Sequence, residues 1–390
     1  MNKAVDNDDL HINEAQVSMI QLFKDRRDRL IQRAGAAGID MIMVCDPISL
    51  LYFTGIKIIP YERFIAFLLD VRSGQEQLIL PGLERDAAKD TGITSEFYGD
   101  HDDPFPAVIE FFGTCRLPGV EKNSLPLSVA EKILTGLNHK SLKSIPVLAD
   151  IAGIISDIRL LKDDTELKYL CMATRYSDEI LAEIAAKIHL GQTEKDITVE
   201  IMRAMAAQPK LLINDFVIQV LAGTGSADPH GYASDRALKT GDPITIDFGV
   251  CYQHYWSDCT RTFFIGPPKR KFKEVYQIVL EAQQEAIAKV RPGVAMAEVD
   301  LAARGVISKA GYGEYFIHRI GHGIGLSIHE PPSLHSQNLT LLAEGMVFTI
   351  EPGIYIPGLG GIRIEEDVTV TANGVEVLTH YPKSYIDMVL

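Results

Sequence analysis

The sequence predicts two domains, a small N-terminal α/β domain over residues 1–155 and a larger α+β domain over residues 156–390. Three observations predict this fold class. Short apolar runs alternate with amphipathic helices through the first 150 residues, which is the pattern of an α/β fold. The remainder combines long helices with strand-rich segments, two of which share one outline. The length of 390 residues allows each domain its own hydrophobic core.

The N-terminal domain is expected to begin with an amphipathic helix over 13–37. Apolar runs bounded by Asp, Pro or Gly predict buried strands, and they lie within 39–47, 63–71, 76–80 and 145–149. Helical patterns lie between these strands, over 83–90 and 129–137. This alternation is typical of one small α/β domain.

The C-terminal domain is expected to begin with a helix that Thr165 caps and Gly191 ends. Thr193 is followed by Asp196 three residues on, which predicts a capping box and a second helix. A third long helix spans about 271–290. Strand-rich segments lie between and after these helices, so the domain is predicted to be α+β.

Two strand segments of the C-terminal domain repeat one outline: a glycine, an alternating strand, then an acid. GDPITID ends at Asp247, and GMVFTIE ends at Glu351. Because side chains alternate between the two faces of a strand, each acid emerges from the polar face of a half-buried strand. A turn and a returning strand then supply a second acid, Asp258 or Glu365. The repeat predicts two similar halves that deliver four carboxylates to one site.

Four carboxylates in one cleft need compensating positive charge. Their mutual repulsion and lost hydration would otherwise cost several kcal/mol. Two divalent cations would carry that charge. A ligand set of carboxylates and one imidazole, without thiolate, suits Mn²⁺ best, with Co²⁺ and Zn²⁺ as competitors. Two such ions about 3.5–4 Å apart can share a water and deprotonate it near neutral pH, which gives a hydroxide nucleophile.

The composition argues against several classes of partner. A formal net charge of −14 repels phosphate backbones, so a nucleic-acid partner is not expected. The N-terminus MNKAVDNDDLHINEAQ lacks the features of a signal peptide, and no run approaches 18 apolar residues, so no membrane span is expected. The five cysteines are scattered without a CxxC pair, which favours reduced thiols and a cytoplasmic protein.

Four motifs, DFG…SDCTRT, GHGIG…HEPP, EPGIY and GIRIEED, occur in the order and spacing of the pita-bread metallopeptidases. The sequence resembles this family, which includes methionine aminopeptidase, aminopeptidase P, prolidase and the metal-free relative creatinase. The motifs cover most of residues 160–390, and the first 150 residues are similar to the additional α/β domain of prolidases, aminopeptidases P and creatinases. The resemblance implies a creatinase-type N-terminal domain, a pita-bread domain with duplicated α-β halves, and a homodimer.

The resemblance also implies a complete set of metal ligands. Asp247 would hold one metal, His322 and Glu351 would complete the second, and Asp258 and Glu365 would bridge the two. Glycines on both sides of His322 would let the backbone approach the metals closely. Since all five ligands are present, the loss of metal seen in creatinase is not expected.

Further residues of the motifs would act on the substrate. His329 would donate a hydrogen bond to the carbonyl oxygen, and Glu351 would also carry a proton to the leaving nitrogen. His230 would act in catalysis and, with His318, would line the substrate pocket. Arg363 would hold the substrate carboxylate.

The first expectation for the reaction is hydrolysis of the Xaa-Pro bond in dipeptides, as in prolidase, by a metal-bridging hydroxide. Aminopeptidase P, which cuts the same bond in longer peptides, is the alternative. A wall of the pocket would set this chain-length limit, and FTGIKIIPYERF, residues 53–64, is the candidate wall. A small-amide hydrolase, similar to ectoine hydrolase or creatinase, and a non-catalytic binding protein are further alternatives, and the complete ligand set argues against the last.

Overall fold

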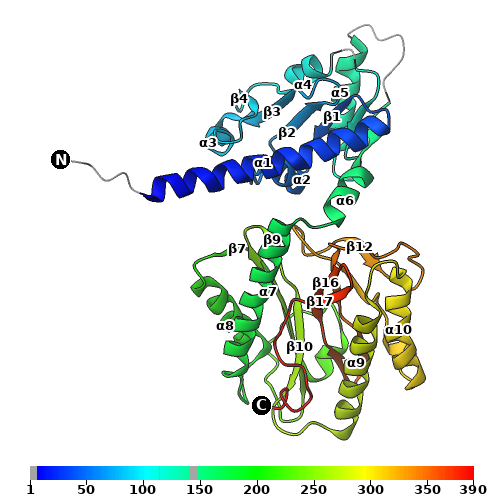
Figure 1. Cartoon of the computed structure of the whole chain (residues 1–390). Helices are drawn as coiled ribbons and strands as arrows, with labels where there is room; N and C mark the ends of the chain where they lie inside the picture. Colours follow the sequence, from blue (N-terminus) through cyan, green and yellow to red (C-terminus); the bar gives the residue numbers. More distant parts are fainter. Residues whose placement is uncertain (1–6, 114, 140–146) are drawn as a thin grey trace, which may run out of the picture. The chain divides into compact units, whose positions relative to one another are not determined.

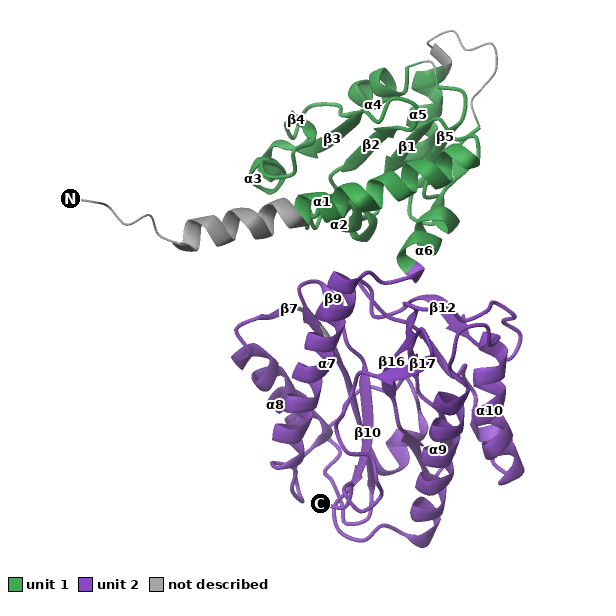
Figure 2. Cartoon of the chain, viewed as in Figure 1, with its two compact units in different colours: residues 1–159 green, residues 160–390 purple. Residues whose placement is uncertain are grey.

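The computed structural model describes residues 7–113, 115–139 and 147–390, without the side chains of 7–18, 138–139 and 214–216. The chain divides into two compact units, Met1–Arg159 and Leu160–Leu390 (Figure 2). The boundary expected at residues 155 and 156 falls inside helix α6 (Ala152–Leu160), a helix that the sequence analysis did not predict. Residues 145 and 146 of the expected strand 145–149 lie outside the described residues.

The N-terminal unit contains a six-stranded mixed sheet with the order β4-β3-β2-β1-β5-β6. The strands are β1 (Met41–Val44), β2 (Ala66–Asp70), β3 (Glu76–Pro81), β4 (Thr94–Tyr98), β5 (Pro118–Val120) and β6 (Ala149–Asp150). Besides α6, the helices of this unit are α1 (Asn7–Ala36), α2 (Pro47–Thr54), η1 (Gly82–Glu84), α3 (Arg85–Ala88), α4 (Phe105–Phe112) and α5 (Leu127–His139). The predicted α/β alternation is confirmed.

Helices α4 and α5 bury one face of this sheet (Figure 1). Phe112 of α4 and Ile133 of α5 join Met43 and Leu68 in one hydrophobic cluster. Met43 lies opposite Leu68 in the antiparallel pairing of β1 with β2, so the two side chains share a face.

Helix α2 begins shortly after β1 ends, because the residues between them cap a helix. Asp46 accepts hydrogen bonds from the backbone N–H groups of Ile48 and Ser49, and Pro47 occupies the first helical turn. Gly55, at a φ of 77°, ends the helix. The expected strand 39–47 is therefore shorter than predicted.

The C-terminal unit has two pairs of helices, α7 (Asp164–Ala185) with α8 (Glu194–Ala207), and α9 (Arg270–Lys289) with α10 (Met296–Lys309). Thr193 caps α8 through the predicted capping box. The cap predicted at Thr165 is wrong, because the carboxylate of Asp163 accepts the N–H groups of Thr165 and Glu166. Helix α10 was not anticipated. No helix in the described ranges is long and apolar enough to span a membrane.

Three sheets complete the C-terminal unit, and two short 3-10 helices, η2 (Gly223–Ala227) and η3 (Gly313–Tyr315), lie between strands. The first sheet contains β7 (Leu211–Ala222), β8 (Pro243–Tyr252), β9 (Tyr255–Trp256) and β10 (Cys259–Phe264). The second contains β11 (Gly321–Gly323), β12 (Glu330–Leu334), β13 (Val347–Ile350), β16 (Glu366–Thr371) and β17 (Gly374–Val377). The third is the hairpin of β14 (Gly353–Ile356) and β15 (Gly360–Arg363).

The two predicted halves are present in this unit. Helices α7 and α8 contact β8 and β7, whereas α9 and α10 contact β13 and β12 (Figure 1). The antiparallel pairs β8–β10 and β13–β16 occupy corresponding places, and Gly241 and Gly345, which precede them, both adopt a positive φ. The side chains between these layers form one continuous hydrophobic core that includes Ile246, Phe248, Phe348 and Ile350.

Candidate metal centre and active site

The four predicted carboxylates come from the paired strands of the two halves or from residues directly next to those strands. Asp247 lies in β8 opposite Thr260 of β10, and Asp258 lies just before β10. Glu351 directly follows β13, and Glu365 directly precedes β16. The strand pairing therefore brings together acids that are up to 118 residues apart in the sequence.

These carboxylates and two histidines form three groups of possible metal ligands. In each group, one ligand atom from every member lies within 4.8 Å of the others. The groups are Asp247, Asp258 and Glu365; His322, Glu351 and Glu365; and Asp258, His322 and His329. Since Glu365 belongs to the first two groups, it lies between them. All five predicted ligands are brought together.

His322 is held as a neutral imidazole with one nitrogen facing the acids. Its Nδ1 lies 3.2 Å from the backbone oxygen of Gly323, so Nδ1 carries the proton and donates it. Its Nε2 lies 3.3 Å from Glu351 Oε1 and 3.8 Å from Asp258 Oδ2. Burial lowers the pKa of His322 to about 3, which keeps the ring neutral. A backbone carbonyl that fixes the other nitrogen is the usual support of a metal-binding histidine.

The carboxylates of the cluster are strongly perturbed by burial and by one another. Burial, followed by the charge of Asp247, raises the pKa of Asp258 well above its ordinary value. Burial and the charge of Asp258 do the same for Glu365. Burial raises the pKa of Glu351 to about 7. A carboxyl cluster with these shifts would bind protons near neutral pH unless a cation takes their place.

Besides the raised pKa values, an unpartnered buried oxygen indicates that these side chains fit metal cations. Asp258 Oδ1 is buried and has no hydrogen-bond partner among the described residues. A buried carboxylate oxygen without a partner is costly, and a cation would satisfy it. Among the described residues, Arg363 is the one Lys or Arg side chain that forms an ion pair with these acids, so the four carboxylates, when ionised, keep three negative charges for metal ions to balance. Hard oxygen ligands with one imidazole suit divalent first-row metals.

Arg363 is almost completely buried and its donors are largely engaged. It donates to Asp247 Oδ2 through a very short contact and to Gln219 Oε1 at 2.8 Å. It also donates to the Tyr355 hydroxyl at 2.9 Å and to Thr260 Oγ1 at 3.2 Å. Of its five N–H groups, these contacts leave one on Nη1 for another acceptor. The geometry therefore ties Arg363 to the metal-side carboxylate rather than leaving it open toward a substrate.

The three other predicted histidines lie around the cluster in different states. The ring of His329 is 3.8 Å from that of His322 between centroids, and His329 is partly buried against this ring while the rest of its surface is exposed. His318 is hydrogen-bonded on both sides, by its Nδ1 to the oxygen of Arg319 at 2.7 Å and by its Nε2 to the Tyr355 hydroxyl at 2.9 Å. Burial lowers its pKa to about 4. His230 is exposed and lies close enough to His318 and His329 to influence both.

Four side chains contribute to this region that the sequence analysis did not single out: Gln219, Thr260, Arg319 and Tyr355. Thr260 donates to Glu365 Oε2 at 2.6 Å. Gln219 was detectable as an amide within the apolar run FVIQVLA at the end of β7, where it lies opposite Asp247. Arg319 is close enough that its charge lowers the pKa of His329, after burial as the larger cause. Tyr355 connects His318 to Arg363, a contact that spacing in the sequence does not reveal.

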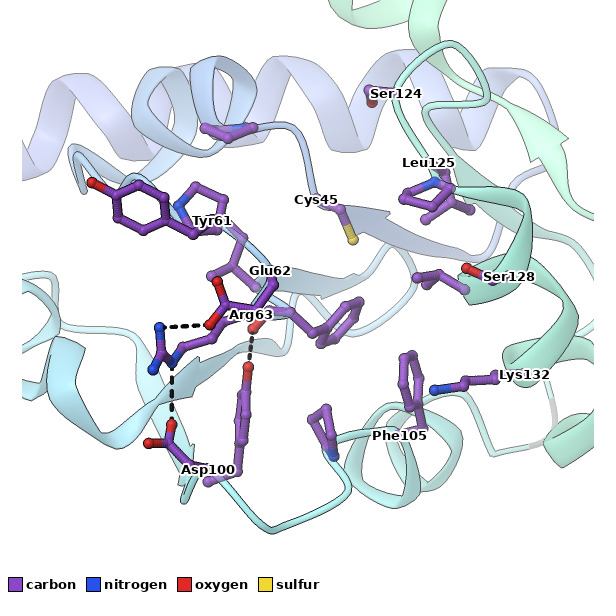
Figure 3. Close-up of a pocket in the computed structure, with 18 residues that line it drawn as sticks. Cys45, Tyr61, Glu62, Arg63, Asp100, Phe105, Ser124, Leu125, Ser128 and Lys132 are labelled. Atoms are coloured by element: carbon purple, nitrogen blue, oxygen red, sulfur yellow. Dashed lines mark hydrogen bonds and ion pairs between the residues drawn. The ribbon is translucent and has the colours of Figure 1, made fainter.

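The candidate wall segment, residues 53–64, lies in the N-terminal unit, and Pro60 to Phe64 line a cavity of about 800 Å³ there (Figure 3). The cavity lies at the edge of the sheet where β1 and β4 end, beside Cys45 and Tyr98. Arg63 is held by ion pairs of 3.1 Å with Glu62 and with Asp100, which fix the turn that carries Tyr61 outward. Tyr61 has a φ of 49° and is 80% exposed.

The chain resembles known proteins along nearly its whole length. It is 37% identical to an uncharacterized peptidase of Staphylococcus aureus over 346 residues, which are 88% of this chain and 95% of the relative. An Xaa-Pro dipeptidase from Bacillus anthracis has a similar structure, with a TM-score of 0.85, 33% identity, and coverage of 94% of this chain and 100% of that one. An X-Pro aminopeptidase from Thermotoga maritima gives a TM-score of 0.80, 32% identity, and coverage of 90% and 99%.

Two family descriptions match consecutive parts of the chain. Residues 26–161 match the creatinase/prolidase N-terminal domain. Residues 169–372, which contain all five clustered metal-ligand candidates, match metallopeptidase family M24. The chain belongs to metallopeptidase family M24 and carries a creatinase/prolidase-type N-terminal domain.

Proposed function

We propose that this protein is a metal-dependent dipeptidase that hydrolyses the Xaa-Pro amide bond. The observation that carries the proposal is the cluster of four carboxylates and His322, with the ring of His329 tilted against the ring of His322. The fold of this chain is similar over 94% of its length to that of an Xaa-Pro dipeptidase. An acidic, oxygen-rich centre in a metallopeptidase fold supports hydrolysis of an amide.

Five side chains would hold two divalent metals: Asp247, Asp258, His322, Glu351 and Glu365. Asp247 and Asp258 share one group with Glu365, and His322 and Glu351 share the other, which supports Glu365 as a bridge. Asp258 is the second proposed bridge, since its Oδ2 also lies 3.8 Å from His322. When bound, the metals would supply an activated water and polarise the carbonyl of the substrate. We propose Mn²⁺ first, with Co²⁺ or Zn²⁺ as alternatives, because the donors are mainly carboxylate oxygens.

The remaining chemistry is proposed for residues of the chain. His329 is neutral at pH 7, because burial and the charge of Arg319 lower its pKa, so one ring nitrogen can donate to the carbonyl oxygen as it gains negative charge. Glu351 would also carry a proton to the leaving nitrogen. The nitrogen of an Xaa-Pro bond carries no hydrogen, so the leaving group depends on this protonation.

Substrate positioning is proposed for His230, His318 and Arg363. His230 is exposed beside His318 and His329, where it can contact the scissile amide. His318 and Arg363 share the hydroxyl of Tyr355 and would act on the substrate carboxylate together with it. Arg363 has one N–H left for that carboxylate, so its larger contribution would be to orient Asp247 and Tyr355.

The alternative is an Xaa-Pro aminopeptidase, which would cut the same bond in longer peptides. The resemblance to an X-Pro aminopeptidase is nearly as strong as that to the dipeptidase. Hydrolysis of Ala-Pro and Ala-Pro-Ala by the Mn²⁺-loaded enzyme separates the two. We expect cleavage of Ala-Pro alone, and efficient cleavage of the tripeptide would establish the aminopeptidase. If neither is cut, a small-amide hydrolase similar to ectoine hydrolase or creatinase becomes the better proposal.

We also propose a homodimer and a cytoplasmic location. All five cysteines are free thiols, which suits a reducing compartment. The homodimer is what the resemblance of the sequence to the pita-bread metallopeptidases implies. Light scattering of the purified chain tests the dimer.

A further inference from the structure

Glu194 is a buried carboxylate that the proposed reaction does not use. It is the first residue of α8 and is only 2% exposed. Acidic residues are common in the first turn of a helix, where they normally face water and stabilise the helix dipole. Glu194 instead points inward, and a buried carboxylate persists only where strong hydrogen bonds replace its hydration.

Three donors from two places in the chain surround Glu194. Its Oε1 accepts the backbone N–H of Ala222 at 2.6 Å. Its Oε2 accepts the backbone N–H of Ser234 at 2.8 Å and the Ser234 hydroxyl at 2.6 Å. One carboxylate thus holds both ends of the segment 223–233, which we call the His230 segment.

The interior of the His230 segment is tied to the metal side of the site. Gln219 donates to the oxygen of Gly231 at 2.9 Å and accepts from Arg363 at 2.8 Å. The hydroxyl of Ser226 accepts the N–H of Gly361 at 2.8 Å. Among the residues that the structure describes, the imidazole of His230 has no hydrogen-bond partner on the protein, so the backbone of the segment sets its position.

We infer that Glu194 is a positioning residue for His230: it fixes both ends of the His230 segment so that the imidazole stays in the substrate pocket. The inference rests on the proposed function only in assigning His230 to that pocket. A free segment of this length samples many conformations, and anchoring both ends removes most of them before substrate arrives. The role acts through His230, because Glu194 contacts neither the metal ligands nor His230 itself.

Glu194→Gln tests the inference with little change in shape. The glutamine amide keeps one acceptor oxygen and replaces the other with a donor, so one end of the segment loses its acceptor. We expect kcat/KM for Ala-Pro to fall by about 10- to 100-fold, the size expected for a displacement of about 1 Å. In a His230→Ala background the same substitution should change kcat/KM by less than about twofold, because the two residues act as one unit.

Equal losses in both backgrounds, or no loss in either, would overturn the inference. Ser234→Ala is the milder variant: it removes one of the three donors, and we expect a smaller loss with the same dependence on His230. It keeps the test available if Glu194→Gln does not fold. Glu200→Gln is the matched control on the same helix, since Glu200 pairs with the exposed Arg203 and should leave activity unchanged.

Hydrogen exchange of the metal-free protein gives a readout that does not depend on activity. In Glu194→Gln the amides of 223–233 should exchange faster, while those of β8 and α8 keep wild-type rates. If the wild type cleaves no Xaa-Pro peptide, the proposed function is wrong. The hydrogen exchange of residues 223–233 then still tests whether Glu194 anchors the His230 segment. Unchanged exchange in 223–233 would contradict it.

Discussion

His322 Nε2 lies 3.3 Å from Glu351 Oε1, and the two atoms face each other as acceptors. The ring proton of His322 is on Nδ1, directed at the oxygen of Gly323. Two lone pairs at this separation repel unless a cation or a proton lies between them. A proton on Glu351, whose pKa burial raises to about 7, is one solution, and a metal ion would provide the other.

Asp258→Asn should abolish metal binding at this pair of sites while it preserves the fold. Asp258 is the acid whose Oδ1 has no partner among the described residues, and asparagine has the same shape without the charge. We expect activity to fall by more than about 100-fold, beyond the loss typical of changes around a metal ligand. Elemental analysis and thermal unfolding of the metal-free form check this. An active variant with its full metal content would rule out Asp258 as a ligand.

Thr260→Val should weaken metal binding without removing a ligand. The Thr260 hydroxyl donates to Glu365 Oε2 at 2.6 Å and accepts from Arg363 at 3.2 Å, so it orients two groups of the centre. We expect a metal affinity about 10- to 100-fold lower. Calorimetric titration of the metal-free protein measures it, with Thr371→Val at the far end of β16 as the control. Equal affinities in both variants would contradict the role of the hydroxyl.

Glu121 makes the stability of the N-terminal unit depend on pH. Burial raises its pKa from 4.5 to about 7, against a hydrogen bond of 2.6 Å from Ser49 that lowers it. The folded state therefore holds the proton more tightly than the unfolded state, and stability falls as pH rises from about 4.5 to about 7.

Glu121→Gln removes this dependence, since the amide has no charge to bury. Its stability relative to the wild type should grow by about 2 kcal/mol between pH 5 and pH 8. Urea unfolding at the two pH values, followed by a probe in the N-terminal unit, measures the difference. If the unfolding free energies of Glu121→Gln and the wild type differ by the same amount at pH 5 and pH 8, Glu121 titrates normally.

Lys162→Met should strongly destabilise the C-terminal unit. Lys162 and Glu330 form an ion pair of 2.9 Å whose side chains are 1% and 6% exposed. Removal of one partner leaves a buried charge, at a cost of about 3–5 kcal/mol. The double variant Lys162→Met/Glu330→Gln should recover part of that loss. Lys187→Met, in an exposed pair with Glu183, should cost less than about 0.5 kcal/mol. Similar losses of stability in Lys162→Met and Lys187→Met would contradict this account.

The sequence could predict the ligands because they occur in local patterns. Asp247 lies within β8 and Glu351 directly follows β13, two strands whose alternation is readable in the sequence, and Thr193 with Asp196 forms a capping box within four residues. Gln219 and Glu194 could not be assigned in this way. Their contacts join residues 144 and 40 positions apart, to Arg363 and to Ser234, and only the folded chain brings them together.

Arg363 shows the same limit. Its place two residues before Glu365 was recognisable, but not the four acceptors that engage its guanidinium across β7, β8, β10 and β14. The prediction of the α7 cap was wrong for a local reason. Asp163, Asp164 and Thr165 are all residues that cap helices well, and the sequence alone favoured Thr165 over Asp163.

The most direct test of the central claim is the rate of Ala-Pro hydrolysis by metal-free protein as Mn²⁺ is added in known equivalents. The account predicts negligible hydrolysis without metal and a rise that levels off at about two equivalents per chain, as a dinuclear site requires. Hydrolysis that persists in the metal-free protein, or no hydrolysis of Ala-Pro after two equivalents are bound, would contradict it.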